Sequence, residues 1–155
     1  VIGGGLELAC TAHIRVAESS TYYALPEGQR GIFVGGGGSV RLPRLIGVSR
    51  MMDMMLTGRT YDAQSGFSMG LSQYVVDAGK GLDKALELAR KVCSNAPMTN
   101  FAVMHALPRI AESDPSAGYL TESLMAAISQ GNEEAKRRIR DFLAKRTTKV
   151  VGPQS

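Results

Sequence analysis

The chain has 155 residues, of which 44% are hydrophobic, 21% charged and 6% aromatic. This composition is typical of a globular protein with one hydrophobic core of ordinary size, and it excludes a disordered chain. The net charge is only +4, no apolar run reaches the roughly 18 residues of a membrane span, and no aromatic-basic pattern is present, so we expect neither nucleic acid nor a membrane as partner.

The first half of the chain is expected to alternate short strands and helices. Apolar periodicity predicts a helix at residues 6–11, extended segments at 14–17 and 21–24, helices at 39–46 and 48–56, and a strand at 73–76. Four methionines in the helix at 48–56 are expected to form an adaptable part of the core: Met51, Met52, Met54 and Met55. The glycine-containing stretch at 77–81 divides the chain into a domain at 1–80 and a helical domain at 81–155.

The second half reads as helices alone. Pro97 and Pro115 are expected to begin helices, and Pro108 is expected to kink or end a helix that starts near Thr99. The last helix is basic, and an apolar stripe of Ala135, Ile139, Phe142 and Leu143 predicts that its charges face outward. Those charges are Lys136, Arg137, Arg138, Arg140, Lys145, Arg146 and Lys149.

Cysteines and histidines give no pattern for a metal or a disulfide. Cys10 and Cys93 lie far apart and have no metal-ligand partners, which predicts reduced thiols and a reducing, cytoplasmic compartment. His13 and His105 also lack such partners, so we predict no metal site and expect His105 to belong to a packed helix.

The residues that suggest chemistry stand at the start of the chain. Glycines at 3–5 open an apolar run, so their N–H groups lie bare at the N-terminus of the predicted helix, where negative charge is favoured. Glu7 follows one turn later, and Glu27 ends the extended segment. Either glutamate alone is commonly structural, but together with a bare N–H they predict carbonyl chemistry, with one carboxyl as base and the other as acid. The glycine loop (residues 35–38) lacks the Lys-Ser/Thr of a nucleotide-binding loop.

Five blocks, in order, resemble the enoyl-CoA hydratase/isomerase family, also called crotonases. They are GGGLELA, IRVAE, LPEGQRGIFVGGGGSVRLPRLIG, LTGRTYDAQSGFSMGLSQYVV and FLAKR, and the resemblance extends from residue 1 to about residue 147. The resemblance implies an α/β fold: the last turns of a spiral of strand-strand-helix units, followed by a helical C-terminal region that packs subunits into homotrimers or homohexamers. His13 stands where the family commonly has aspartate, and Val34 where it has proline.

The resemblance also implies roles for individual residues. Glu7 and Glu27 match the catalytic glutamates, and Gly4 matches an oxyanion-hole glycine. The implied substrate-binding residues are Gly3, Gly5, Pro26, Gly28, Gly31, Phe33 and Lys145, the last of these near the phosphates of coenzyme A. The family begins roughly a hundred residues earlier, with the second oxyanion donor, so Val1 is expected to be a mid-motif start.

In the family that the chain resembles, hydratases characteristically have both glutamates, so the resemblance implies hydration of a trans-2-enoyl-CoA to a 3-hydroxyacyl-CoA, a lyase reaction of fatty acid metabolism. The acyl-CoA thioester would be the substrate, with no separate cofactor. Two alternatives stay open: an isomerase that uses Glu27 alone, and a catalytically silent remnant that acts through subunit association.

Overall fold

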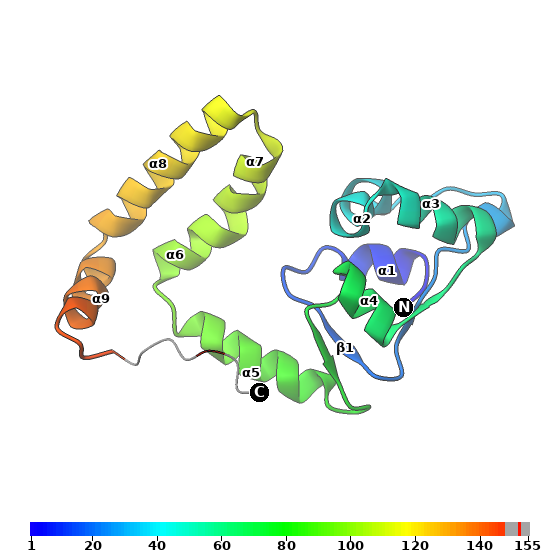
Figure 1. The fold of residues 1–155 in the computed structure, drawn as a ribbon, viewed down its shortest axis with the longest axis horizontal. Coiled ribbons are helices and arrows are strands. Elements are labelled where there is room, and N and C mark those ends of the chain that lie inside the picture. The colour runs from blue at the N-terminus through cyan, green and yellow to red at the C-terminus, as the bar shows by residue number, and fades with distance from the viewer. Residues whose placement is uncertain (148–151, 153–155) are drawn as a thin grey trace. The chain divides into compact units, whose positions relative to one another are not determined.

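The computed structural model describes residues 1–147 and residue 152. They belong to two compact units, Val1–Ala89 and Arg90–Ser155, and helix α5 (Gly81–Cys93) runs across the division. The first unit mixes short strands with helices, and the second is helical wherever it has regular structure (Figure 1). Lys149, predicted to belong to the basic helix, lies outside the described residues.

The first unit is built from short elements around two small sheets. Its helices before α5 are α1 (Gly4–Ala9), α2 (Gly38–Ile46), α3 (Val48–Thr57) and α4 (Ala63–Met69), with the 3-10 turn η1 (Gly28–Arg30). Its strands are β1 (Val16–Glu18), β2 (Tyr22–Tyr23), β3 (Tyr61–Asp62) and β4 (Tyr74–Val76). Strands β1 and β4 pair in parallel, with Val16 opposite Tyr74, whereas β2 and β3 are antiparallel. The parallel pair requires the long crossover that α2, α3 and α4 supply.

The core of the first unit lies beneath α1, α2 and α3. Its most buried large side chains are Leu6, Leu25, Leu42, Met54 and Leu71. Met51, Met54 and Met55 join this core, as predicted, because spacings of three and four residues place them on one face of α3. The prediction for Met52 was wrong: its side chain lies on another face of the helix and is 52% exposed.

Most predicted elements of the first unit are present with small shifts. The helices at 39–46 and 48–56 and the strand at 73–76 each agree with the structure to within one residue. The first helix begins earlier, at Gly4, because the Gly3 carbonyl already accepts hydrogen bonds from the N–H groups of Leu6 and Glu7 (2.8 and 3.0 Å). Strand β1 begins later than predicted. The Arg15 N–H donates to Oε1 of Gln73 (2.8 Å) instead of to a strand.

The start of α5 is anchored to β1 by a carboxylate. Oε1 of Glu18 accepts a hydrogen bond from the Gly81 N–H (3.0 Å). Backbone N–H groups of Gly79 and Gly81 lower the pKa of Glu18 below its ordinary value, since they stabilise the charged form. This contact joins segments 63 residues apart and holds the helix N-terminus against the strand.

The second unit contains α6 (Pro97–Phe101), the π-helix η2 (Ala102–Ala106), α7 (Leu107–Glu112), α8 (Pro115–Gly131) and α9 (Glu133–Leu143). Pro97 and Pro115 begin helices, as predicted, and Asp114 caps α8 by accepting from the N–H groups of Ser116 and Ala117. The disruption expected from Pro108 takes the form of the π-helical turn before it, because proline has no N–H to donate, and the chain then continues as α7.

His105 lies in this π-helical turn. This turn packs against α8, as predicted for the helix that carries His105, while the His105 side chain itself is exposed and its ring lies 4.9 Å from the ring of Phe101.

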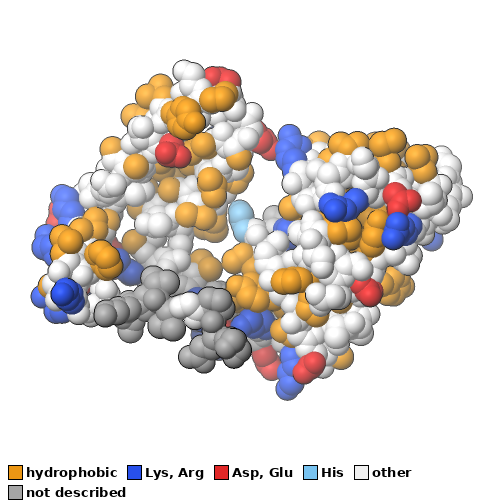
Figure 2. Space-filling view, viewed as in Figure 1, with side chains coloured by type: hydrophobic (Ala, Val, Ile, Leu, Met, Phe, Trp, Pro, Cys, Tyr) orange, Lys and Arg blue, Asp and Glu red, His pale blue; other side chains and the backbone are white. Residues whose placement is uncertain are grey.

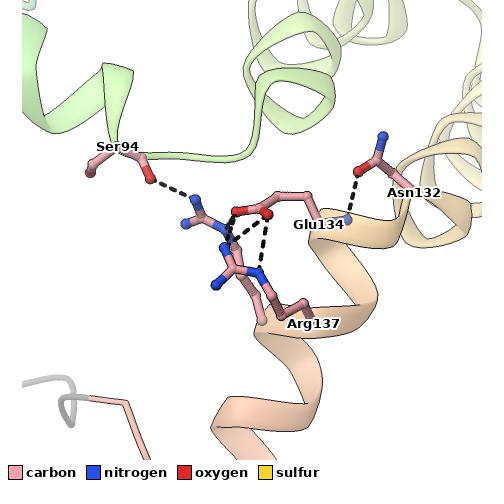
Figure 3. Close-up of polar contacts among 5 residues, drawn as sticks. Ser94, Asn132, Glu134 and Arg137 are labelled. Carbon is pink, nitrogen blue, oxygen red and sulfur yellow. Dashed lines mark hydrogen bonds and ion pairs between the residues drawn. The ribbon is translucent and has the colours of Figure 1, made fainter.

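Helix α9 is held by charge pairs on its own surface. Asn132 caps its first turn, and the Glu134 carboxylate accepts from both Arg137 and Arg138, which lowers the pKa of Glu134 (Figure 3). The Arg138 guanidinium also donates to the Ser94 carbonyl at the end of α5 (2.9 Å), where a cation complements the helix dipole. The apolar stripe of α9 is not buried: Ile139, Phe142 and Leu143 are 46%, 69% and 72% exposed.

No helix in the described part of the chain is long and apolar enough to cross a bilayer.

Candidate active site

The glycine turn at residues 3–5 brings two distant parts of the first unit together. Gly3 adopts φ 53° and ψ −125°, a conformation that side-chain-bearing residues rarely adopt, and its N–H donates to the Ala24 carbonyl (2.9 Å). A Cβ on Gly3 would lie 2.7 Å from Oε1 of Glu27. Glycine is therefore required here both by the backbone conformation and by the approach of a carboxylate.

The next residue presents a bare donor. Gly4 is the first residue of α1, and its N–H donates no hydrogen bond within the described chain. A Cβ on Gly4 or on Gly5 would meet nothing within 4 Å. The Gly4 N–H therefore lies at a helix N-terminus with open space beside it, which suits an incoming carbonyl oxygen.

Glu7 lies one turn along α1, and its carboxylate is held by the glycine loop. Its side chain is buried, with 5% of the residue exposed. Oε1 accepts hydrogen bonds from the N–H groups of Gly36 (2.8 Å) and Gly38 (2.7 Å), at the N-terminus of α2. A Cβ on Gly38 would lie 2.8 Å from Oε1, so the loop must be glycine for the carboxylate to come this close. These two donors fix the orientation of the carboxylate.

Glu27 is the second buried carboxyl of the site and is 7% exposed. It follows Pro26 and precedes η1, and Oε2 is buried without a hydrogen-bond partner among the described residues. The neighbouring Gly28 lies directly against α3, because a Cβ there would be only 2.2 Å from the Met55 carbonyl oxygen. Buried carboxyl oxygens without partners are rare in folded proteins, which marks Glu27 as a candidate to bind water or a ligand.

The structure thus brings together most of the predicted site. Gly3 and Glu27 lie in direct proximity, and Gly4, Gly5 and Glu7 lie on helix α1, which begins directly after Gly3. Gly31 ends η1 in the left-handed conformation (φ 69°). Phe33 lies between η1 and the glycine loop in the sequence and is 69% exposed. Lys145 belongs to the second unit, just beyond the end of α9, and has a φ of 56°.

Sequence reasoning missed the donors of the glycine loop and a basic residue behind it. The sequence indicated only that the loop is not a nucleotide-binding loop, whereas its Gly36 and Gly38 N–H groups donate to Glu7 directly. Arg41, in the first turn of α2, donates from Nη1 to the Gly36 carbonyl (3.0 Å). The sequence did contain a signal for these donors, because successive glycines at the start of a helix expose several N–H groups in a row.

Three other residues considered in the sequence analysis lie either in the core or at the surface. Burial raises the pKa of Cys10, an effect that the positive charges of Arg15 and Arg41 oppose, so its thiol is a core group rather than a nucleophile. Val34 is buried in the core and His13 is exposed. Within residues 1–147 and 152, no three Asp, Glu, His or Cys side chains come together as metal ligands would.

A bare N–H beside two buried carboxyls can polarise a carbonyl group and transfer protons next to it.

Comparison with known proteins identifies the family of the chain. The family model for enoyl-CoA hydratase/isomerase matches residues 1–152. The chain belongs to this family. Its fold is the crotonase fold, and the family acts on coenzyme A thioesters.

Individual relatives cover nearly the whole chain. It is 36% identical to the fatty acid oxidation complex subunit alpha of Shewanella loihica and 32% identical to the mouse enoyl-CoA hydratase domain-containing protein 2, mitochondrial, over 97% of its length in both cases. A crystal structure of a provisionally assigned enoyl-CoA hydratase from Rhodopseudomonas palustris is 68% identical and superposes on 94% of the chain with a TM-score of 0.90.

The chain spans only part of each relative: 22% of the Shewanella protein, 52% of the mouse protein and 57% of the Rhodopseudomonas chain. Relatives also differ in name. A Penicillium crustosum protein, 34% identical over 87% of the chain, is called an enoyl-CoA isomerase/hydratase.

Proposed function

We propose that the protein is an enoyl-CoA hydratase that adds water, reversibly and with syn stereochemistry, to a trans-2-enoyl-CoA to give a 3-hydroxyacyl-CoA. The observation that carries the proposal is the pair of buried carboxyls, Glu7 and Glu27, beside the bare Gly4 N–H. Hydration needs a base and an acid acting on one water molecule, whereas moving a double bond needs only one proton shuttle. Two poised carboxyls therefore favour hydration.

In this mechanism the thioester oxygen accepts a hydrogen bond from the Gly4 N–H, which stabilises the enolate-like charge of the transition state. Glu7, whose Oε1 is held by two N–H groups, has Oε2 left to orient the water and take its proton as oxygen attacks the β-carbon. Glu27 delivers a proton to the α-carbon through its buried Oε2, which has no partner among the described residues. The water supplies the hydroxyl group, and a proton transfer between the carboxyls restores the starting state.

The other parts of the proposal concern binding, assembly and location. Gly3, Gly5, Pro26, Gly28, Gly31 and Phe33 would line the thioester site, Lys145 would contact the phosphates of coenzyme A, and no separate cofactor is needed. Leu124 on α8 and Phe142 on α9 are exposed, and Figure 2 shows hydrophobic side chains on the surface of the second unit. Such exposed apolar side chains support assembly into a homotrimer or homohexamer. The two free cysteines support a cytoplasmic location.

The test is hydration of crotonyl-CoA, followed by loss of the conjugated enoyl-thioester absorbance. Glu7→Gln and Glu27→Gln should each lower kcat by about 10²- to 10⁴-fold, the usual contribution of a positioned acid or base. Glu122→Gln, the same change at an exposed position on α8, is the matched control and should leave the rate unchanged. Full turnover in both active-site variants would refute the assignment.

Isomerisation is the second candidate because a relative carries that name. If the protein is an isomerase, Glu27→Gln should lose activity on a 3-enoyl-CoA and Glu7→Gln should keep it. The two variants therefore distinguish isomerisation from hydration.

A further inference from the structure

Arg41 occupies an unusual position for a cation. It lies in the first turn of α2, where the helix dipole favours negative charge and disfavours positive charge. Its side chain nevertheless turns back past the helix N-terminus to reach the glycine loop, and Nη1 donates to the Gly36 carbonyl (3.0 Å). A local arrangement that opposes the dipole needs a compensating interaction, and such conflicts concentrate at functional sites.

The compensating interaction is contact with the glycine loop itself. A Cβ on Gly37 would lie 2.2 Å from Nη1 and 3.1 Å from Cζ of Arg41, so the guanidinium lies directly on the Gly37 backbone. Gly37 has a φ of 91°, a conformation that glycine adopts freely and equally readily leaves. A run of four glycines has high conformational entropy when unrestrained, so holding it in one conformation requires an external contact.

Arg41 contacts the same glycine loop that binds Glu7. Gly36 accepts from Arg41 through its carbonyl and donates to Glu7 through its N–H, while Gly38 supplies the second donor. Arg41 also acts electrostatically on Cys10, as does Glu7, so the guanidinium and the carboxylate share one neighbourhood. The contact with Gly36 therefore connects Arg41 to the carboxylate through one residue.

We infer that Arg41 is a positioning residue: its guanidinium holds the glycine loop in the conformation that presents the Gly36 and Gly38 N–H groups to Glu7. The effect on turnover rests on the proposed function, because it follows only if Glu7 orients the attacking water. The effect on the loop does not, because the hydrogen bonds to Glu7 exist whatever reaction the site catalyses.

The first experiment measures hydrogen exchange at the Gly36 and Gly38 amides. Both should exchange at least about tenfold faster in Arg41→Ala than in the unaltered protein, because the loop loses the contact that keeps these N–H groups on Glu7. Arg50→Ala is the matched control, since Arg50, on α3, also donates one guanidinium hydrogen bond to a backbone carbonyl, that of Ile46 at the end of α2 (3.0 Å). Unchanged exchange in Arg41→Ala, or equal acceleration in Arg50→Ala, would overturn the inference.

The second experiment measures steady-state hydration of crotonyl-CoA. Arg41→Ala should lower kcat by about tenfold or more with KM changed less than about twofold, since the loop orients Glu7 rather than binding the thioester. Arg41→Lys, which keeps a charge and a donor, should recover part of the loss, as should guanidinium ion added to Arg41→Ala. A rise in KM alone, or no recovery by either route, would assign Arg41 to substrate binding or to general stability instead.

Should Arg41→Ala not fold, the exchange measurement is made on Arg41→Lys, in which intermediate protection is expected and full protection would count against the inference. A wild-type protein without hydratase turnover would refute the proposed function, and the exchange result would still decide the role of Arg41.

Discussion

Replacing Gly38 by alanine should move Glu7 without weakening the fold. A Cβ on Gly38 would lie 2.8 Å from both Cγ and Oε1 of Glu7 and 3.1 Å from Cδ. The side chain must therefore withdraw by about 0.6 Å to reach 3.4 Å, where ordinary contacts begin. Because a misplacement of about 1 Å can cost ~10²-fold in rate, we expect kcat for crotonyl-CoA hydration to fall by about 10- to 100-fold.

The stability of the same variant should behave differently. Gly38 is the first residue of α2 and does not have a positive φ, so alanine introduces no backbone strain there. Alanine favours a helix over glycine by up to about 1 kcal/mol, so the free energy of unfolding should stay constant or rise slightly once Glu7 has moved aside. Loss of activity with retained stability would separate a displaced carboxylate from a damaged fold.

The control for this variant is Gly35→Ala, in the same loop. A Cβ on Gly35 would meet nothing within 4 Å, so this variant should keep wild-type kcat. Initial rates at saturating crotonyl-CoA, together with urea denaturation of both variants, provide the two measurements. Wild-type kcat in Gly38→Ala, or equal losses in the two variants, would refute the assignment of Glu7 as a residue oriented by the glycine loop.

Two further predictions concern stability. Gly28→Ala should lower the free energy of unfolding by about 1–3 kcal/mol in urea, because its Cβ would lie 2.2 Å from the Met55 carbonyl oxygen, whereas Gly131→Ala, with open space, should change it little. The pKa of Glu18 is lowered in the folded state. Its contribution to the free energy of unfolding is therefore complete above the unfolded pKa of about 4.3 and is lost as pH falls through the folded pKa. Urea denaturation at a series of pH values should therefore show Glu18→Gln less stable than wild type near neutrality and equal to it in acid; a difference independent of pH would contradict this.

Local patterns were sufficient to predict most of the elements. Prolines mark the starts of α6 and α8, and apolar spacing placed α2 and α3 to within one residue. Errors arose where the decisive partner was distant in sequence. Strand β1 is set by pairing with β4, not by its own composition, and Met52 follows the geometry of α3 rather than its apolar neighbours. The π-helical turn before Pro108 is a compromise between proline and helix continuity that propensity alone does not specify.

The sequence was sufficient to identify the candidate reactive groups, but not the residues that hold them in place. Glu7 and Glu27 stand out because each follows a recognisable local signal, a glycine turn or a proline. The donors to Glu7 come from residues 29 and 31 positions further along the chain, and no local pattern states that the glycine loop folds back onto α1. Arg41 is harder still to find, since its place at a helix N-terminus is opposed by the dipole and becomes favourable only through the loop that it contacts.

The glycines of the site serve different purposes that look alike in the sequence. Gly3 turns the chain and also leaves room for Oε1 of Glu27, whereas Gly4 has open space and contributes a bare N–H. Gly36 and Gly38 both donate to Glu7 and would both crowd it if they carried a Cβ. A substitution to alanine should therefore act through a displaced carboxylate at Gly38 and through backbone strain at Gly3. The role of each glycine at this site depends on which group of the protein occupies the space that a side chain would fill. That group is determined by the folded structure and not by the local sequence.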